Sequence, residues 1–541
     1  MACTPVIFVP GLTCSFNLPV LLDWREPTLG GWNFPPFIDY GGYFVKAFQQ
    51  VGYTRDRDLF VAFYDWRKAV KDSADNYLIP WIERAKRRSG AKQVILVAHS
   101  MGGLVARSYI QSAAYPARND VARLITLGTP HRGSAESYVP WGSGELQSDP
   151  TIRAVFNVYL WYLRHAHPFQ TDLQPLRTIR TMVPSLRDLL PIDDYLTAHT
   201  EPPQPMGEDS MRERNLWGDL LNQAAAVETL CTRVPVTTIA GTGFRTISGY
   251  LVGSPPAPPE DPARYPDGLP NQEHSSDDGD GTVLTSSARV DHPQATNLPP
   301  LLVPHGKLPD QPEALALLFA TLGLAAPTLG APLEPQTVLV ILTASPVTMS
   351  VELPSGPPMS GPDVLGAAAQ PTRQRRQRVR ARNYGHRGKQ LNMVVVSNPA
   401  AGAYNVRLAG TATGVFALGA LLIGPVGATV LGAAADSLSL NEPAATPITT
   451  VHGQVAAASE LYYQVLVSTP DQAPEISFDT ATTMARTVDR LQAALGADSG
   501  VLGAGDMSDP AAMATLAEQA LGPLDRELAV ALLAQIRALR E

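Results

Sequence analysis

Cysteine is scarce in this sequence, which has only three such residues among 541. Cys3, Cys14 and Cys231 cannot form a disulfide framework; one bridge among them stays open, and they do not fix the redox compartment. Charged residues are also few, at 17%, and the acidic ones prevail, so the formal net charge is −8. This balance excludes a global nucleic-acid binder, and we expect no nucleic-acid partner.

The sequence also lacks a convincing membrane span. Residues 408–435 contain no charged side chain, but glycines and Pro425 interrupt the apolar run, so we predict buried strands with turns there. The N-terminus leads from Met1 into the strand-like VIFVPG within a few residues, which leaves no room for a signal peptide. We expect either a cytoplasmic protein or a secreted one whose leader is absent from this sequence.

The histidines and carboxylates lack the compact spacing of a metalloenzyme signature. We therefore expect no metal and no cofactor, with a structural ion near Asp277 left open.

The stretch VILVAHSMGGLVARSY, residues 94–109, carries the strongest functional signal. A strand-like apolar run leads to Ser100, and a helical pattern follows it. Ala98 and Gly102 stand two residues before and two after Ser100, where a sharp strand-to-helix turn is crowded and needs small side chains. The pattern is G-x-S-x-G with alanine in first place, and it predicts that Ser100 is a nucleophile.

An earlier strand-like run, residues 5–9, ends in Pro10-Gly11-Leu12. In an α/β-hydrolase the loop after an early strand supplies one backbone N–H of the oxyanion hole, and the residue after the nucleophile supplies the other. We therefore predict that Leu12 and Met101 are the two donors. The alternative for Pro10-Gly11 is an ordinary turn at the end of a strand.

Strands and helices alternate through this part of the chain. Strands are predicted at 59–63, 121–127 and 234–240, and helices at 43–51 and 72–88. This alternation predicts a parallel sheet covered by helices on both faces.

Several motifs together resemble one family, the lecithin:cholesterol acyltransferase-like branch of the α/β-hydrolase lipases. They are YDWR (64–67), AHSMGG (98–103), LGTPHRGS (127–134), PSLRDLLP (184–191) and GDGTV (279–283). The resemblance extends over roughly residues 5–324. It implies an α/β-hydrolase fold and a serine acyl hydrolase or acyltransferase that acts on lipid-like esters, without choosing the substrate.

The alternation stops between Ser134 and about residue 233, where helical runs at 152–163 and 217–230 are rich in large apolar residues. An insertion on the active-site side of the sheet is where a lid or cap shields an ester from water. We predict a cap over 134–233; the alternative is that each aromatic residue belongs to an ordinary helical core.

The other two members of a triad follow from chain order, which in this fold is Ser, then Asp, then His. Asp280 lies between two glycines in GDGTV, so a tight loop presents its carboxylate, whereas Asp277 and Asp278 are expected to face solvent. His305 lies directly before an amphipathic helix predicted at 313–322, and the resembling family places its base in such a loop. His292 is the alternative base, and the histidines that precede Asp280 are expected to be structural.

A mechanism follows from these assignments. His305 takes the proton of Ser100 as its oxygen attacks an ester carbonyl, and Asp280 orients the imidazole. Asp65 and Trp66 follow a strand, so they border the site or have a packing role.

Near residue 325 the composition shifts to Pro, Ala, Gly and Thr. Predicted strands at 337–343, 347–353, 391–397 and 404–409 suggest an antiparallel β-sandwich over 325–475, and a strand at 461–467 suggests a second small sheet. Between 373 and 387 lie seven arginines, some at alternate positions, which indicate either contact with an anionic surface or a charged strand edge that prevents aggregation. Residues 476–541 are predicted to form a helical tail.

At this length, with 45% hydrophobic residues, the chain can bury more than one core. We predict a catalytic domain over 1–324, the sandwich and the tail. The favoured function is a serine carboxylic-ester hydrolase on lipid-like or other hydrophobic esters, including lipase, phospholipase or polyester hydrolase. An acyltransferase with the same triad and a non-catalytic surface-binding protein are the alternatives, with peripheral membrane contact as a possible property and the oligomeric state left open.

Overall fold

The computed structural model describes most of the chain up to residue 327 and the strands beyond it. The described residues are 4–17, 20–21, 29–35, 40–144, 175–253, 263–327, 337–344, 346–354, 359–360, 378–386, 389–423, 449–455, 459–468, 474–479 and 482–483. The chain divides into two compact units, the first ending at Glu334 and the second beginning at Pro335.

The first unit is built on a parallel sheet of six strands in the order β10-β7-β4-β3-β1-β2. The strands are β1 (Val6–Val9), β2 (Leu59–Val61), β3 (Val94–His99), β4 (Val121–Leu127), β7 (Val236–Ile239) and β10 (Thr296–Asn297). Nearly all residues of β1, β3 and β7 are buried, as expected when helices cover both faces of a parallel sheet. The α/β-hydrolase fold predicted from the sequence is confirmed.

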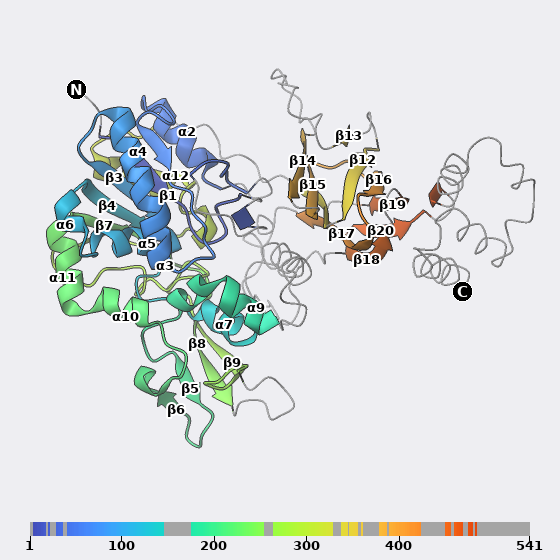
Figure 1. Ribbon diagram of the computed structural model, residues 1–541. Coiled ribbons are helices and arrows are strands. Elements are labelled where there is room, and N and C mark those ends of the chain that lie inside the picture. Colours follow the sequence, from blue (N-terminus) through green and yellow to red (C-terminus); the bar gives the residue numbers. More distant parts are fainter. Residues whose placement is uncertain are drawn as a thin grey trace, which may run out of the picture. The chain divides into compact units, whose positions relative to one another are not determined.

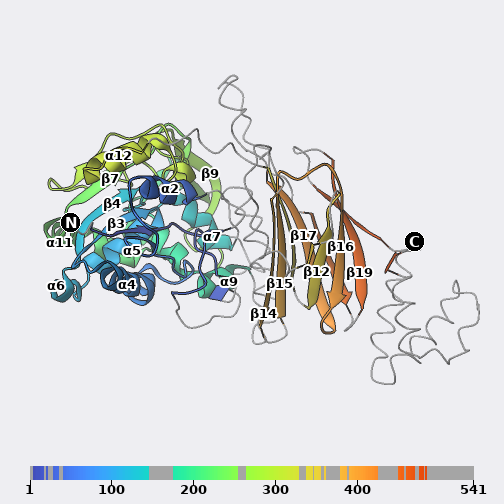
Figure 2. The same cartoon turned by 90° about the horizontal axis from the view of Figure 1, so that it is seen from above.

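Helices lie on both faces of this sheet. Figure 2 shows α2 (Gly42–Gln50) and α12 (Pro312–Leu322) over one face and α4 (Ile79–Ser89) and α5 (Met101–Ile110) over the other. Phe48 of α2 and Phe319 of α12 pack together, with their ring centroids 4.8 Å apart. The helix predicted at 72–88 is continuous but not uniform: a π-helical turn, η1 (Ala74–Leu78), separates α3 (Val70–Ser73) from α4. Pro80 has no N–H to donate, which interrupts the regular hydrogen-bond ladder at this point.

The second unit is a sandwich of two antiparallel five-stranded sheets (Figure 1). Their orders are β14-β15-β11-β17-β18 and β13-β12-β16-β19-β20. The bounds are β11 (Val338–Ala344), β12 (Val347–Glu352), β13 (Met359–Ser360), β14 (Arg378–His386), β15 (Lys389–Ser397), β16 (Gly402–Gly410), β17 (Gly414–Ile423), β18 (Thr449–Val455), β19 (Glu460–Val467) and β20 (Glu475–Phe478). Residues of both sheets share one apolar core, among them Ile341, Leu418, Val406 and Val465.

The sandwich contains the predicted strand at 461–467, part of the uncharged stretch and part of the arginine-rich stretch. The strand expected at 461–467 is β19, which lies inside the second sheet and not in a separate one, because it pairs with β16 along its length. The uncharged stretch from residue 408 forms the end of β16 and then β17, and among the described residues no helix is both long and apolar enough to cross a membrane. Arg378, Arg380 and Arg382 occupy alternate positions of β14, an edge strand. The other four arginines of this stretch lie outside the described residues. So does the predicted helical tail apart from residues 476–479 and 482–483, and residues 476–478 form the end of β20 and not a helix.

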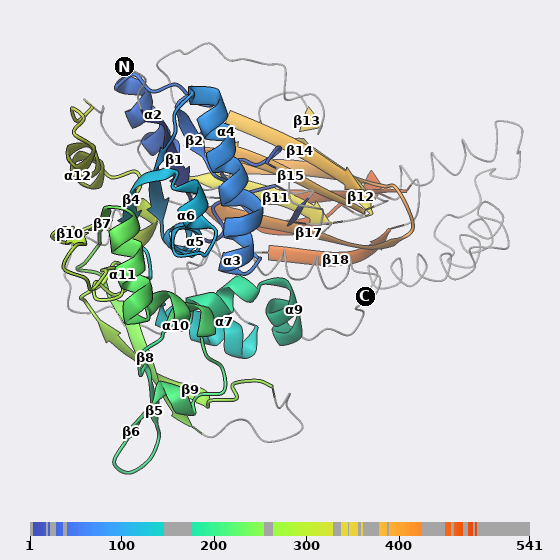
Figure 3. The same ribbon diagram turned by 60° about the vertical axis from the view of Figure 1, so that its left-hand side comes forward.

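The segment predicted as a cap contains helices and also a small sheet that the sequence did not predict. Its helical elements are η2 (Ala135–Ser137), α7 (Tyr138–Ser143), α9 (Pro175–Met182), η3 (Pro184–Leu189), η4 (Glu208–Ser210), α10 (Leu216–Asn222) and α11 (Ala224–Arg233). Strands β5 (Leu196–Ala198) and β6 (Gln204–Met206) pair with β8 (Thr246–Gly253) and β9 (Leu269–Ser276), which come from the stretch expected to be irregular. Figure 3 shows this sheet extending away from the parallel sheet.

The helix expected at 217–230 is divided. Gln223 has extended backbone angles (φ −55°, ψ 140°), so α10 ends before it and α11 begins after it. The helix expected at 152–163 lies outside the described residues.

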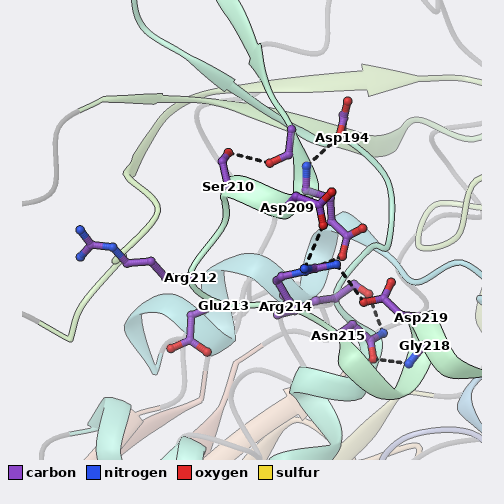
Figure 4. A network of polar contacts seen from close by, with 12 residues as sticks. Asp194, Asp209, Ser210, Arg212, Glu213, Arg214, Asn215, Gly218 and Asp219 are labelled. Carbon is purple, nitrogen blue, oxygen red and sulfur yellow. Dashed lines mark hydrogen bonds and ion pairs between the residues drawn. The ribbon is translucent and has the colours of Figure 1, made fainter.

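Charged side chains hold the start of α10 in place (Figure 4). The guanidinium of Arg214 pairs with Glu208, Asp209 and Asp219 at 2.9, 3.0 and 3.3 Å. The side chain of Asn215 accepts a hydrogen bond from Gly218 N at 2.7 Å and so caps α10. Local ion pairs and a cap therefore fix the entry of the chain into this helix.

The end of α10 is attached to the nucleophile's helix by a buried arginine. Arg107, on α5, is fully buried and donates hydrogen bonds to the Leu221 carbonyl at 2.5 Å, to Asn222 Oδ1 at 3.2 Å and to His131 Nδ1 at 3.1 Å. Burial lowers its pKa to about 10. Since its partners are neutral acceptors, the desolvation of this cation is offset by hydrogen bonds alone.

We predict that Arg107→Met loosens α10 and α11. The substitution keeps most of the buried volume but removes the hydrogen bonds of the guanidinium to the Leu221 carbonyl and to Asn222 Oδ1, which costs about 1–3 kcal/mol. Hydrogen exchange should rise in residues 216–233 and the first unit should unfold at lower urea concentration. Lys71→Met, which removes an exposed cation, is the control, and equal exchange in both variants would contradict the anchoring role.

Candidate active site

Ser100 lies at the sharp turn between β3 and α5. Its backbone adopts φ 54° and ψ −133°, a strained conformation for a non-glycine residue. A Cβ on Gly102 would lie 2.4 Å from the Val9 carbonyl oxygen, and one on Gly103 would lie 2.0 Å from Thr129 Oγ1. The glycines that the motif places after the serine are therefore required by close packing against β1 and the loop after β4.

The structure brings Ser100, His305 and Asp280 together in one hydrogen-bonded line. The Ser100 hydroxyl lies 2.9 Å from His305 Nε2, and His305 Nδ1 lies 2.8 Å from Asp280 Oδ2. Nδ1 donates to the carboxylate, so Nε2 is left to accept the proton of the serine. The residues come from three separate places: the β3–α5 turn, the loop after β9 and the short helix η5 (His305–Lys307).

The carboxylate of Asp280 is held by its own loop. Its Oδ1 accepts hydrogen bonds from the backbone N–H groups of Thr282 and Val283, at 3.0 and 2.7 Å, and the side chain is 1% exposed. The backbone N–H of His305 donates to the Asp280 carbonyl at 2.8 Å. These bonds fix the aspartate and the histidine relative to each other. Asp277 and Asp278 are exposed, as expected.

Two opposing effects act on His305. Burial disfavours its imidazolium, but the charge of Asp280 and the hydrogen bond to it, with a contribution from Glu136, outweigh burial and raise the pKa of His305 above its ordinary value. The site is therefore arranged to stabilise a positive charge on this ring, which is the charge that a general base acquires.

The two predicted oxyanion donors belong to segments that meet at Ser100. Gly11 is so close that a Cβ on it would lie 2.9 Å from Ser100 Cβ, and Leu12 follows it. Met101 is the first residue of α5. Within the described part of the chain, neither the N–H of Leu12 nor that of Met101 donates to another residue. Their role as oxyanion donors remains a prediction.

A second polar network, which sequence analysis missed, connects the loops around Ser100. The Gly11 N–H donates to the Tyr40 hydroxyl at 3.2 Å, and that hydroxyl lies 2.8 Å from His99 Nδ1. His99 Nε2 lies 2.9 Å from the His305 carbonyl, which can only accept, so Nε2 carries the proton and Nδ1 accepts from Tyr40. Burial, with a smaller contribution from His305, holds the pKa of His99 well below its ordinary value. A neutral His99 therefore links the oxyanion loop to the loop of His305.

Two of the other described histidines have their own partners, and His165 and His167 lie outside the described residues. His131 is buried against Arg107, and His292, the alternative base, contacts Glu228 at 2.8 Å. Cys14 and Cys231 are free thiols, so they do not form the bridge that was left open between them. Among the described residues no group of three or more histidines, cysteines and carboxylates is placed to hold a metal ion.

The contacts of the YDWR motif favour its packing role. Asp65 and Arg67 are 1% and 0% exposed and form an ion pair with two hydrogen bonds, at 2.8 and 2.7 Å. Arg67 also donates to the carbonyls of Val20 and Leu21 at 2.9 and 2.6 Å, and Trp66 Nε1 donates to the Ser15 carbonyl at 3.0 Å. This motif therefore fastens the segment after the oxyanion loop to the sheet.

The fold and the strand–serine–helix turn define the chain as an α/β-hydrolase. Residues 41–159 match the model of the lecithin:cholesterol acyltransferase family, and the resemblance predicted from the motifs is confirmed. The matched segment includes Ser100 but ends before Asp280 and His305.

Curated relatives agree with this assignment. The chain is 31% identical over 148 residues to the lysosomal phospholipase A and acyltransferase of Canis lupus familiaris, which covers 25% of this chain and 36% of that protein. It is 33% identical over 111 residues to a triacylglycerol lipase of Pseudarthrobacter phenanthrenivorans, which covers 19% and 32%. The chain thus spans about a third of the length of the curated relatives it matches.

Among solved structures, a Bacillus licheniformis lipase in its propeptide form matches at 14% identity and a TM-score of 0.31, over 88% of this chain and 96% of that one. A likeness at this score adds nothing to the fold assignment, which stands on the sheet order.

We predict that Asp65→Ala destabilises the first unit by about 3–5 kcal/mol, because it leaves the Arg67 cation buried without its counter-ion. Urea unfolding would measure the loss. The fraction of Asp65→Ala protein that stays folded should still hydrolyse an esterase substrate with the KM of the wild-type protein. A large rise in KM without loss of stability would instead support a position at the border of the substrate site.

Proposed function

We propose that the protein is a serine carboxylic-ester hydrolase that acts on lipid-like acyl esters through an acyl-enzyme. The observation that carries the proposal is the Ser100–His305–Asp280 line, with hydrogen bonds of 2.9 and 2.8 Å. A nucleophile, a base and a residue that orients the base are the groups that acyl transfer needs, and they lie within bonding reach of one another.

The steps follow from this geometry. His305 Nε2 takes the proton of Ser100 as Oγ attacks the ester carbonyl carbon, and the backbone N–H groups of Leu12 and Met101 bind the resulting oxyanion. The imidazolium then gives its proton to the leaving alcohol as the tetrahedral intermediate collapses to an acyl-enzyme. Water enters, loses a proton to His305 and attacks the acyl carbonyl, and the fatty acid leaves as Ser100 regains its proton.

Two further observations support a lipid-like ester as the substrate. The relatives named above are a phospholipase A and acyltransferase and a triacylglycerol lipase. Leu216 and Leu220, one turn apart on α10 of the cap, are 55% and 50% exposed. Such a pair of apolar side chains suits peripheral contact with a lipid surface.

Acyl transfer is the second candidate function. It uses the same residues, with an alcohol in place of water in the second half of the reaction, and the names of the phospholipase A and acyltransferase relatives favour it. A non-catalytic surface-binding protein is the third, and the hydrogen-bonded line at Ser100 argues against it.

We predict that Ser100→Ala abolishes hydrolysis of p-nitrophenyl acyl esters, with a loss of at least about a thousandfold. Labelling of the protein by a fluorophosphonate should disappear in the same variant. Ser112→Ala is the matched control, because the Ser112 hydroxyl is buried without a hydrogen-bond partner in the described structure and should leave both readouts unchanged.

Unlabelled wild-type protein, or full activity of pure Ser100→Ala, would contradict the proposal and favour a binding protein.

Hydrolysis and transfer are separated by their products. We predict that the wild-type protein, given a phospholipid and increasing amounts of a long-chain alcohol, releases mainly fatty acid. Mass spectrometry would measure the ratio of fatty acid to new ester. An ester product that exceeds the acid at low millimolar alcohol would establish the acyltransferase instead.

A further inference from the structure

The peptide unit between Pro10 and Gly11 is held at both of its polar groups by tyrosine side chains. Its carbonyl oxygen, which belongs to Pro10, accepts a hydrogen bond from the Tyr64 hydroxyl at 2.8 Å. Its N–H, which belongs to Gly11, donates to the Tyr40 hydroxyl at 3.2 Å. Neither tyrosine takes part in the proposed chemistry, although the next peptide unit carries the N–H of Leu12, a predicted oxyanion donor.

Both tyrosines are buried and come from separate segments. Tyr64, the first residue of YDWR, is 1% exposed, and its backbone N–H donates to Ser15 Oγ at 3.3 Å. Tyr40 directly precedes α2 and is 4% exposed. Burial raises the pKa of both phenols well above the ordinary value, so both hydroxyls keep their protons.

The segment of Tyr40 is itself attached to the segment that follows the catalytic histidine. Asp310, three residues after η5, accepts hydrogen bonds from the backbone N–H groups of Gly41 and Phe44 at 2.6 and 2.9 Å. The Tyr40 hydroxyl also donates to His99 Nδ1 at 2.8 Å. The hydroxyl that receives the Gly11 N–H is therefore fixed from two directions.

The Pro10–Gly11 unit contacts the nucleophile's turn. A Cβ on Gly102 would lie 2.6 Å from the Pro10 carbonyl oxygen, and one on Gly11 would lie 2.9 Å from Ser100 Cβ. Without a Cβ, Gly11 can adopt many backbone conformations, so its own φ and ψ do not fix the direction of the Leu12 N–H. Hydrogen bonds at both ends of the preceding unit supply the restraint that the glycine lacks.

We propose that Tyr40 and Tyr64 form a tyrosine clamp that positions the oxyanion hole: they hold the Pro10–Gly11 unit so that the Leu12 N–H is aimed at the ester oxygen before the substrate binds. The inference rests on the proposed function. A donor held in place needs no reorganisation when negative charge develops on that oxygen. Because the charge exists in the transition state and not in the bound ester, the clamp acts on kcat and hardly on KM.

The test uses Tyr40→Phe and Tyr64→Phe, each of which removes one hydroxyl and keeps the ring. For a p-nitrophenyl acyl ester, kcat should fall about tenfold in each variant, less than the hundredfold or more that follows the loss of a donor itself. KM should stay within about twofold of the wild-type value. The double variant, with the unit free at both ends, should lose at least about a hundredfold.

A second readout reports the oxyanion directly. An alkyl trifluoromethyl ketone forms a tetrahedral adduct with the serine and places a negative oxygen where the ester oxygen would lie. Its affinity should fall in each variant by the same factor as kcat/KM, as expected of a transition-state analogue.

Tyr115→Phe is the matched control. Tyr115 is 1% exposed, and its hydroxyl donates to the Val121 carbonyl at 3.2 Å, at the start of β4. The variant thus loses the same kind of buried hydrogen bond elsewhere and should keep the wild-type kcat and ketone affinity. Circular dichroism checks that each variant is folded; since Tyr40→Phe and Tyr64→Phe loosen the same peptide unit, either one alone is decisive.

The pH profile of kcat/KM separates the clamp from an effect on the base. Tyr40 also reaches the His305 carbonyl through His99, whereas the Tyr64 hydroxyl bonds to Pro10. A change at His305 would move the profile, because the profile reports the ionisation of the base. The clamp predicts an unmoved profile in both variants.

The outcomes distinguish this inference from the proposed function. Wild-type protein that a fluorophosphonate does not label would overturn the proposed function. If the wild-type protein is labelled but both variants match Tyr115→Phe in kcat and ketone affinity, the clamp alone is wrong. A loss confined to KM, or a shifted pH profile, would also overturn the clamp.

Discussion

The structure of the catalytic unit depends on one constraint, the strained backbone of Ser100 between β3 and α5. To lift its hydroxyl out of the sheet, the chain takes φ 54° at this residue and brings α5 close to β1 and to Thr129. Only glycine fits at 102 and 103 under these contacts. The strain is tolerated because β3 lies in the middle of the sheet and the Ser100 N–H bonds to the Leu127 carbonyl, so packing on all sides determines the turn.

The rest of the unit brings other groups to this fixed point. The oxyanion loop after β1, the Asp280 loop and the His305 loop reach Ser100 from widely separated parts of the chain, and polar networks hold them. Tyr40 and His99 join the first of these loops to the last through the Gly11 N–H and the His305 carbonyl. Arg107 extends the same framework from α5 to α10. A neutral histidine and buried neutral acceptors give rigidity here without a further net charge beside the nucleophile.

The net electrostatic effect of the site favours a positive charge on His305. Asp280 raises the pKa of His305 in spite of burial, and Glu136 adds to this effect. Asp280 fixes the ring through a direct hydrogen bond of 2.8 Å.

The sequence by itself determined the local elements and the order of the motifs. Apolar periodicity predicted β4 to the residue and five of the ten sandwich strands to within two residues at each end. The small residues around Ser100 predicted the turn, because these patterns record contacts between neighbours in the chain. Tertiary structure alone decided the rest: the pairing of β5 and β6 with β8 and β9, the place of β19, the buried ion pair of Asp65 with Arg67, and the approach of Tyr40 and His99 to the site. These depend on contacts between distant segments, and no local periodicity encodes which buried polar group will meet which partner.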